Sequence, residues 1–454
     1  MGERKEVDVA ILGGGISGLT AGFLLARDGR SVAVLERAAH PGGSIRTWKE
    51  NGFIFELGPN TVLNNAPEID ALCEAAGVMG SRLRPTPESK RRYVVKNGQL
   101  VPLPGGPVGF FRTPLFTFRA KLRLLKEPFI GRPPEGTEES IAQFTYRRLG
   151  EEFLDYAVGP FVSGVYAGDP ERLSVRHATA RIHALEERHG SLIRGAFARR
   201  KGPAPAGGLF SFAAGLEELP LALAGNLAGA WQPETVVTAV TRSGERYDVQ
   251  AARAGEERRW SARAVVSALP AVAASRTLAA LGGEFPEQIA SLPYADVAVV
   301  CLGYRREQVA HPLDGFGFLA PAVEKRHVLG CLFPSSLFAG RAPDGHVALA
   351  AFVGGAMHPE RVSAEPDEIQ SAVCADLGGL LGISGEPVIS RVERWRPAIP
   401  QYVVGHGALK EAAQSFEAAN PGVFLSGNIL HGVSVADCIR NATNLAKRVA
   451  GFLE

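Results

Sequence analysis

VDVAILGGGISGLTAGFLLARDGRSVAVLE, residues 7–36, is the stretch that decides the fold of this chain. It opens with Val7–Leu12, a short apolar run with enough β-branched residues for a strand buried on both faces of a parallel sheet. A glycine turn follows, and apolar residues then recur at helical spacing until a second strand at Ser31–Leu35. The glycines of the turn spell G-x-G-x-x-G and are Gly13, Gly15 and Gly18. The stretch therefore predicts a strand, a turn, a helix and a second strand in succession.

This succession is typical of a dinucleotide site. Glycines let the backbone approach a pyrophosphate closely, and the N–H groups at a helix N-terminus stabilise its charge. Glu36 ends the second strand, where a carboxylate can accept hydrogen bonds from both hydroxyls of a ribose. A glycine-rich turn by itself is often only a turn, but here strand, helix, second strand and acid agree. We therefore expect this stretch to hold the adenosine end of a dinucleotide.

Length, charge and cysteines limit the class of protein. The 454 residues suggest about two or three domains, and 49 basic against 47 acidic residues leave no global charge footprint for nucleic acid. The five cysteines form no C-x-x-C pair, so no metal site is expected. No apolar run is long enough for a membrane span, and the N-terminus lacks a signal-peptide core, which predicts a cytoplasmic protein. Residues 199–208, rich in Gly, Pro and basic residues, predict a linker.

Three further glycine turns indicate which dinucleotide is bound. Pro41–Arg46, PGGSIR, is typical of flavoproteins that bury FAD, whereas nicotinamide dehydrogenases need only the first turn; a surface turn is the alternative. Gly58–Thr61 turns the chain again, and the amide of Asn60 either faces a ring system or serves the turn. Near the C-terminus, Val423–Asn428 predicts a strand that enters a glycine turn, followed by a helix from about Val435. That helix N-terminus suits the flavin end of FAD.

The middle of the chain offers a substrate site and a surface segment. Arg92 precedes a strand and could clamp a carboxylate with its planar guanidinium, although cations at such positions are more often solvated. Residues 110–126 interleave phenylalanines with Arg and Lys, which fits a segment on an anionic bilayer and, nearly as well, core packing with snorkelling cations. Residues 155–164 are small and apolar, so the backbone there can approach a flat ligand.

With these motifs in order, the chain resembles the glutathione-reductase-like flavoproteins of the amine oxidase superfamily, and specifically the protoporphyrinogen oxidase family. The resemblance runs almost end to end. Beyond the glycine turns it rests on Gly58–Thr61, Lys90–Tyr93, Pro160–Gly164, Ala167–Pro170, Gly190–Gly195, Asp314–Pro321, Phe352–Gly355, Trp395 and Ile399–Tyr402.

The resemblance implies an α/β fold with three parts. These are a discontinuous Rossmann-type FAD-binding domain of residues 1–87, 213–291 and 396–454, a mixed β-sheet substrate-binding domain of residues 88–93, 184–212 and 292–395, and a mainly helical, membrane-associating domain of residues 94–183. It also implies peripheral contact with the inner face of the cell membrane, contact with ferrochelatase or another haem-pathway enzyme, and a monomer or homodimer.

The resemblance further implies roles for individual residues. The residues implied around FAD are Gly13, Gly15, Ile16, Ser17, Gly18, Glu36, Arg37, Gly42, Gly43, Arg46, Gly58, Pro59, Asn60, the backbone of Val237, Trp395, Gly427, Asn428, Val433, Ser434 and Val435. Around the substrate it implies Arg92 on a propionate, the Gly164 carbonyl at the pyrrole N–H groups, and Asn60 in the catalytic set. It places three apolar side chains against the macrocycle, those of Leu319, Leu332 and Phe352.

The implied activity is the oxygen-dependent oxidation of protoporphyrinogen IX to protoporphyrin IX. Coproporphyrinogen III is the alternative substrate, and it should require several cations at the mouth of the site, where the matching motifs supply only Arg92 and Arg91. A flavin amine oxidase is a further alternative, but the lysine usual near the flavin in those enzymes is missing from Ala295–Val300. A porphyrin carrier without turnover is the non-enzymatic alternative.

Overall fold

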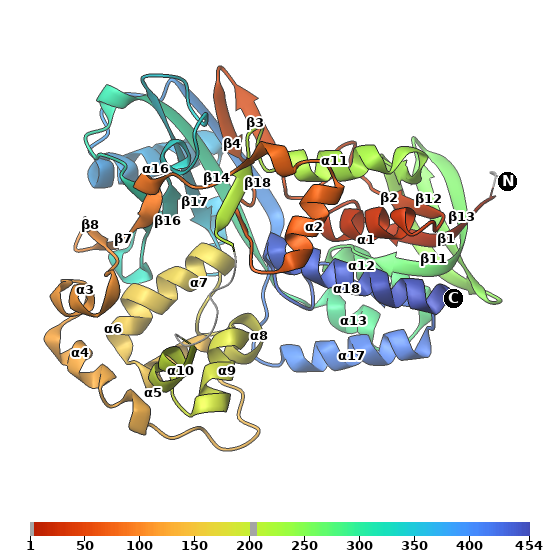
Figure 1. Cartoon of the computed structure of the whole chain (residues 1–454), viewed down its shortest axis with the longest axis horizontal. Helices are drawn as coiled ribbons and strands as arrows, with labels where there is room; N and C mark the ends of the chain where they lie inside the picture. Colours follow the sequence, from red (N-terminus) through yellow and green to blue (C-terminus); the bar gives the residue numbers. More distant parts are fainter. Residues whose placement is uncertain (1–3, 200–206) are drawn as a thin grey trace.

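The computed structural model describes residues 4–199 and 207–454, and Figure 1 shows two sheets beside a group of helices. Apart from its ends, the linker expected at residues 199–208 lies outside the described residues. The described chain contains two seven-stranded sheets, together with a two-stranded and a three-stranded sheet. The fold is therefore a mixed α/β fold.

The first sheet has a parallel half and an antiparallel half. Its order is β10-β2-β1-β13-β12-β11, and β19 pairs with β13. The pairs β10–β2, β2–β1, β1–β13 and β13–β19 are parallel, and β13–β12–β11 is an antiparallel meander. The strands are β1 (Arg4–Leu12), β2 (Val32–Leu35), β10 (Trp231–Gln232), β11 (Thr235–Ser243), β12 (Arg246–Arg253), β13 (Glu256–Ser267) and β19 (Val423–Leu425).

Helices cover both faces of this sheet, as the prediction of a doubly buried first strand requires. Val9 and Ile11 belong to a core cluster with one set of helices, whereas Ala10 and Leu12 belong to a second cluster with the other set. The first set is α1 (Ile16–Arg27), α2 (Pro67–Ala75), α11 (Glu218–Asn226) and α18 (Val435–Leu453). The second set is α12 (Ala271–Leu278), α13 (Phe285–Ala290) and α17 (His406–Ala419). The strand–turn–helix–strand prediction is confirmed.

The second sheet has the order β18-β14-β17-β16-β15-β7-β8. One of its faces packs on α16 (Pro366–Leu381) and forms a core of its own. The strands are β7 (Arg91–Lys96), β8 (Gln99–Pro102), β14 (Tyr294–Arg305), β15 (Gly315–Leu319), β16 (Val328–Leu332), β17 (His346–Gly354) and β18 (Ile389–Pro400). The expected boundary between residues 395 and 396 thus falls inside β18.

Short elements lie between the longer ones along the chain. They are β3 (Thr47–Glu50) with β4 (Phe53–Glu56), β5 (Val62–Leu63) and β6 (Arg82–Leu83) on either side of β9 (Leu209–Phe212), α14 (Pro334–Leu337), α15 (Glu360–Ser363) and the 3₁₀ turns η1 (Met79–Ser81), η2 (Pro87–Lys90), η5 (Ala228–Ala230), η6 (Ala279–Leu281), η7 (Arg306–Gln308) and η8 (Ala322–Glu324).

Helices α3 to α10 form a separate group, at the lower left of Figure 1. They are α3 (Gly106–Arg112), α4 (Phe118–Leu124), η3 (Glu127–Phe129), α5 (Ile141–Arg148), α6 (Glu151–Phe153), the π-helical turn η4 (Leu154–Val158), α7 (Gly159–Tyr166), α8 (Val175–Ala178), α9 (Ala180–His189) and α10 (Leu192–Arg199). Residues 184–199, expected in the substrate-binding domain, instead lie in α9 and α10, which pack on each other, on α8 and on η3. Within the described residues, no helix combines the length and apolarity that a membrane crossing requires.

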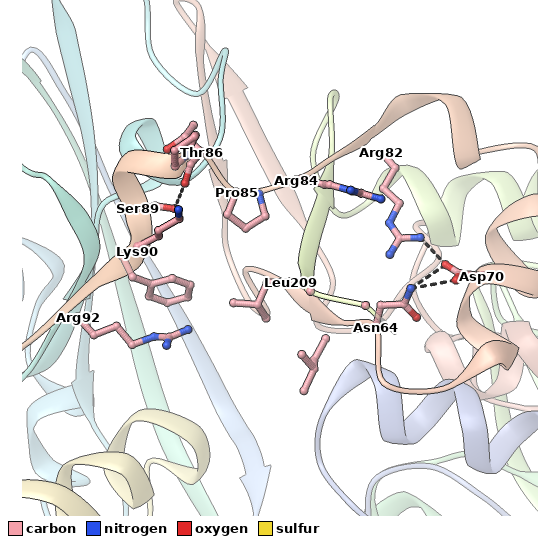
Figure 2. Close-up of a pocket in the computed structure, with 15 residues that line it drawn as sticks. Asn64, Asp70, Arg82, Arg84, Pro85, Thr86, Ser89, Lys90, Arg92 and Leu209 are labelled. Carbon is pink, nitrogen blue, oxygen red and sulfur yellow. Dashed lines mark hydrogen bonds and ion pairs between the residues drawn. The ribbon is translucent and has the colours of Figure 1, made fainter. Parts of the chain in front are cut away.

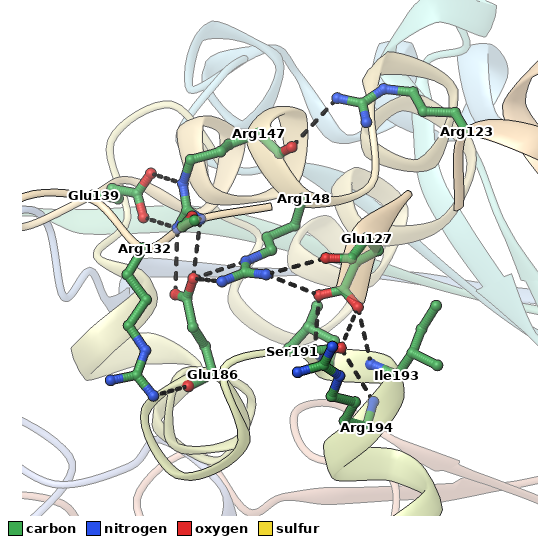
Figure 3. A network of polar contacts seen from close by, with 12 residues as sticks. Arg123, Glu127, Arg132, Glu139, Arg147, Arg148, Glu186, Ser191, Ile193 and Arg194 are labelled. Atoms are coloured by element: carbon green, nitrogen blue, oxygen red, sulfur yellow. Dashed lines mark hydrogen bonds and ion pairs between the residues drawn. The ribbon is translucent and has the colours of Figure 1, made fainter. Parts of the chain in front are cut away.

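A buried ion network joins the helices of this group (Figure 3). Arg148 of α5 is fully buried, and its guanidinium contacts both Glu127 of η3, at 3.2 Å, and Glu186 of α9. Glu127 also accepts the backbone N–H of Leu192, at 2.9 Å, at the start of α10. Burial would raise the pKa of Glu186, but hydrogen bonds from Arg147 and Arg148 lower it. The network therefore connects η3, α5, α9 and α10 through charges that have no access to water.

We predict that Arg148→Met destabilises the protein by about 3–5 kcal/mol, because it leaves two buried carboxylates without their shared cation. The measurement is the midpoint of urea unfolding followed by circular dichroism. Arg448→Met is the matched control: the Arg448 side chain is 56% exposed in its pair with Glu417, so its loss should cost under about 1 kcal/mol. Equal midpoints for the two variants would contradict a structural role for the network.

Candidate functional site

The first glycine turn is shaped for a ligand. Gly13 has φ of +101°, and a Cβ on Gly18 would lie 1.9 Å from the Gly13 carbonyl oxygen, so helix and turn touch through backbone. A Cβ on Gly15 would meet nothing within 4 Å, so this residue faces open space. Gly15 is also the N-cap of α1, where no side chain caps the first turn. The N-terminus of α1 can therefore offer its N–H groups to an anion.

The Glu36 carboxylate is held beside this turn. One oxygen accepts the Gly14 N–H at 2.6 Å and the other accepts the Ala38 N–H at 2.9 Å. Each oxygen keeps a lone pair, because Glu36 has no side-chain partner among the described residues. Arg37 is exposed next to it. Val237 lies at a register shift in β11. Thr235, the first residue of β11, donates its N–H to the Glu36 carbonyl at 2.8 Å.

The second glycine turn lies against the first. The Gly42 N–H donates to the Gly14 carbonyl at 2.8 Å, and Gly15 and Gly42 form an isolated parallel bridge. A Cβ on Gly43 would be 3.4 Å from the Cα of Gly15. Arg46 lies 3.9 Å from a carboxylate oxygen of Glu217. Two turns separated by a strand and a helix in sequence thus meet as one backbone cradle.

The third turn joins this cradle. A Cβ on Gly58 would lie 2.0 Å from the Ser44 carbonyl, so the Gly58–Thr61 turn touches the second glycine turn through backbone. The Asn60 amide donates to the Gly58 carbonyl at 2.9 Å, which is the turn-serving role. The indole of Trp395, on β18, donates to the Leu57 carbonyl at 2.6 Å. The second sheet is thereby fixed next to Gly58 and Pro59.

The C-terminal turn reaches the same edge of the first sheet. Leu12 of β1 pairs with Ser267 of β13, and Ser267 pairs with Leu425 of β19, so these parallel strands end side by side. Gly427, with φ of +92°, follows directly. Carboxyl ends of adjacent parallel strands are the usual ligand-binding edge of such a sheet.

Aromatic residues to which the sequence assigned no role support this turn. The Tyr402 hydroxyl donates to the Asn428 carbonyl at 2.5 Å, and the Tyr402 ring stacks on His406 at 4.4 Å. Burial lowers the pKa of His406 to about 4, so this ring is neutral near neutral pH. Ser434 caps α18 by accepting the Asp437 N–H at 3.1 Å, and Val433 and Val435 flank it.

One face of the second sheet gathers the predicted apolar residues. Leu319 pairs with Gly330, Gly330 pairs with Phe352, and Leu332 pairs with Gly317, so the side chains of Leu319, Leu332 and Phe352 point to the same face. All three are half-buried on a sheet whose other face is a closed core. A Cβ on Gly164 of α7 would lie 2.7 Å from a Leu319 methyl. The structure thus brings these four residues together.

Arg92 lies at the rim of this face, where a pocket of about 890 Å³ opens (Figure 2). Val94 of β7 pairs with Leu319, and Arg92 lies two residues before Val94, so its side chain points to the same face. The Arg92 guanidinium lies 5.1 Å from the centre of the Phe316 ring. The pocket is lined by Leu63, Asn64, Asp70, Arg82, Arg84, Pro85, Thr86, Pro87, Ser89, Lys90, Arg92, Gly207, Gly208, Leu209 and Phe316.

The cations at this pocket differ from those expected. Arg91 pairs with Asp314 and does not line the pocket, which corrects its place among the cations at the mouth. A hydrogen bond from Tyr93, with the Arg91 charge, lowers the pKa of Asp314, so this pair stays charged near neutral pH. Arg84 and Lys90 line the pocket and were missed. The signal for them was the run RLRPTPESKRR at residues 82–92, whose two prolines restrict the chain between its cations.

Comparisons with known proteins identify the family of this chain. Residues 16–450 match the flavin-containing amine oxidoreductase family. A protoporphyrinogen oxidase of Arabidopsis thaliana is 32% identical, covering 98% of this chain and 94% of that protein. The coproporphyrinogen III oxidase of Bacillus subtilis is 28% identical over 95% of each chain.

Solved structures share the fold. A crystal structure from Exiguobacterium sp. 255-15, provisionally named a protoporphyrinogen oxidase, has a TM-score of 0.83 at 25% identity and covers 98% of this chain and 99% of its own. A putrescine oxidase, at 18% identity and a TM-score of 0.75, covers 99% of this chain and 100% of its own and shares the fold. The chain therefore belongs to the flavin-containing amine oxidoreductase family, among the homologues of protoporphyrinogen oxidase, and is an oxidoreductase with FAD as its cofactor.

Proposed function

We propose that this enzyme oxidises protoporphyrinogen IX to protoporphyrin IX, with three O₂ reduced to three H₂O₂, in haem biosynthesis. The observation that carries the proposal is the sheet face with Leu319, Leu332 and Phe352, opposed by Gly164 and bordered by Arg92. A flat apolar macrocycle with anionic substituents matches an apolar face with a cation at its rim. Relatives named for this reaction support the assignment.

The side chains at this face bind and orient the substrate. The Arg92 guanidinium holds a propionate, and the Gly164 carbonyl accepts from pyrrole N–H groups. The apolar side chains exclude water and align a meso carbon with the flavin. When bound, FAD supplies the hydride acceptor and passes the electrons to oxygen. No side-chain base is assigned, because the pyrrole protons can leave to solvent.

FAD itself is proposed to lie along the joined glycine turns in a Rossmann-type domain. The pyrophosphate would lie over Gly15 at the N-terminus of α1, with Ile16, Ser17 and Gly18 in its first turn. Glu36 would hold the ribose. Open space above Gly15 and the free lone pairs of Glu36 support this placement. The remaining proposed contacts are Arg37, Gly42, Gly43, Arg46, Gly58, Pro59, Asn60, Val237, Trp395, Gly427, Asn428, Val433, Ser434 and Val435.

We predict that Glu36→Ala weakens retention of FAD by on the order of 1.5–3 kcal/mol, because it removes charged acceptors of two ribose hydroxyls. The measurement is the ratio of flavin to protein after dilution and gel filtration. Glu257→Ala, which removes a carboxylate that is 81% exposed on β13 of the first sheet, is the control. Full flavin content in Glu36→Ala would assign the ribose to other residues.

Anaerobic mixing with protoporphyrinogen IX tests the function. The absorbance of the bound flavin should bleach and then return when oxygen is admitted. Arg92→Ala should raise KM clearly and lower kcat more modestly, because the guanidinium both binds and aligns the macrocycle. Flavin that stays oxidised with a porphyrinogen but bleaches with an amine would overturn the proposal in favour of an amine oxidase.

Coproporphyrinogen III is the second candidate substrate. The observation that favours it is the set of cations around the pocket beside Arg92, which exceeds what two propionates require. The coproporphyrinogen III oxidase among the relatives covers nearly the whole chain.

We also infer peripheral membrane contact through α3, α4 and η3. Leu115 and Phe116 are buried and Phe110 is half-buried, so these residues follow the core-packing alternative of the two that the sequence left open. Other apolar side chains are exposed, with Phe118 at 72% and Phe129 at 83%. The exposed set is Val108, Phe111, Phe118, Leu122, Leu125 and Phe129. Arg112, Arg119, Arg123 and Lys126 lie between them, which suits an anionic bilayer.

We predict that the protein floats partly with anionic vesicles and that replacing Phe118, Leu125 and Phe129 with serine abolishes flotation. Burying apolar side chains in the interface supplies much of such binding. Replacing Leu221, Val272 and Phe452 with serine, exposed residues on α11, α12 and α18 at some distance in Figure 1, is the control. If both triple variants float equally well with the vesicles, this surface is not the site of membrane contact.

A further inference from the structure

Cations lie on opposite walls of the pocket beside Arg92. Lys90 and Arg92 come from η2 and β7, on the side of the second sheet. Arg82 and Arg84 come from β6 and the chain after it, and Figure 2 shows both on the side of the pocket opposite to Arg92. The wall between is partly apolar. Its apolar members are Leu63, Pro85, Pro87, Leu209 and Phe316.

The cations differ in whether they are already paired. Arg82 forms an ion pair with Asp70 and lies 3.7 Å from the centre of the Phe210 ring. Asp70 is the acidic residue of the lining, and a hydrogen bond from Asn64 and the Arg82 contact lower its pKa, so this pair stays charged near neutral pH. Arg84, Lys90 and Arg92 have no ion pair or side-chain hydrogen bond within the described part of the chain. Three cations therefore line this pocket without an ion-pair partner in the described part of the chain, although the Arg84 charge also helps to lower the pKa of Asp70.

These cations are more numerous and more widely separated than a dicarboxylate substrate requires. The two propionates of protoporphyrinogen IX sit on neighbouring pyrroles, so Arg92 and Lys90, on one wall, can bind both. Coproporphyrinogen III carries a propionate on each of its four pyrroles, so its carboxylates lie on opposite edges of the macrocycle. A cation on the facing wall, such as Arg84, is suited to a carboxylate that only this substrate presents.

We propose that Arg84 is a specificity-determining residue that binds a third propionate and so favours a tetracarboxylate porphyrinogen over a dicarboxylate one. The inference rests on the proposed oxidation of a porphyrinogen at this site, and within that oxidation it favours the second candidate substrate, coproporphyrinogen III, over protoporphyrinogen IX. Removing this interaction lowers the affinity for the tetracarboxylate more than for the dicarboxylate. Arg84 is exposed and takes part in no described ion pair, so its replacement should leave the fold intact.

The test compares kcat/KM for coproporphyrinogen III and protoporphyrinogen IX on one preparation. Arg84→Met should lower the ratio of the two values on the order of tenfold, the loss of one charge-assisted hydrogen bond. Arg84→Lys, which keeps the charge without the planar fork, should fall between wild type and Arg84→Met. Arg276→Met, at an exposed arginine on α12, is the matched control. A ratio within about twofold of wild type in Arg84→Met overturns the proposal.

A binding measurement separates failure of this inference from failure of the proposed function. Titration of the flavin-loaded protein with coproporphyrin III and with protoporphyrin IX, followed by porphyrin fluorescence, needs no turnover. Arg84→Met should weaken binding of coproporphyrin III on the order of tenfold more than binding of protoporphyrin IX. If wild type turns over neither porphyrinogen but Arg84→Met still weakens coproporphyrin III binding more than protoporphyrin IX binding, the proposed oxidation is wrong and the role of Arg84 stands. Equal weakening of both ligands assigns Arg84 a general electrostatic role and overturns the proposal.

Discussion

The common register of β1, β13 and β19 is the constraint on which the rest of the structure depends. Leu12, Ser267 and Leu425 lie side by side across these parallel strands, so the first and last glycine turns begin at one edge of the sheet. The same register alternates β1 side chains between two cores. A slip by one residue would exchange these faces and move both turns out of line. Burial of two helical layers therefore also positions the cofactor edge.

The second sheet uses its two faces differently. One face closes a core with α16, whereas the other leaves Leu319, Leu332 and Phe352 half-buried beneath α7. The helix α7 belongs to the helical group, so the position of Gly164 depends on how that group packs. The buried Arg148 network connects four of its elements and gives this group its own internal restraint. The apolar face of the second sheet is thus bordered by α7, which belongs to the separately stabilised helical group.

Charge in the pocket is distributed between structural pairs and free cations. Arg82 with Asp70 and Arg91 with Asp314 neutralise each other, which leaves Arg84, Lys90 and Arg92 for ligands. These three are exposed, so water solvates them at little cost before a ligand arrives. An anionic ligand would then displace that water and gain pairs in a less polar surrounding. The pocket is therefore prepared for carboxylates without burying uncompensated charge.

The sequence by itself determined the elements whose signals are local. The G-x-G-x-x-G turn between two apolar runs predicted β1, α1 and β2, and the motifs together predicted an FAD-dependent oxidoreductase. These signals are local because strand, turn and helix geometry depend on neighbouring residues. The resemblance also grouped Leu319, Leu332 and Phe352, and the structure places these three side chains on one face of the second sheet.

Only the tertiary structure decided which distant side chains share a surface. It separated buried Phe116 from exposed Phe118, moved Arg91 out of the pocket, and brought Arg84 opposite Arg92. An interleaved run of aromatic and basic residues has the same composition in a core and on a surface, and a run of cations does not reveal which of them meets an acid from another strand. Strand register, helix packing and ion pairing settle those questions, because each depends on contacts between residues far apart in the chain.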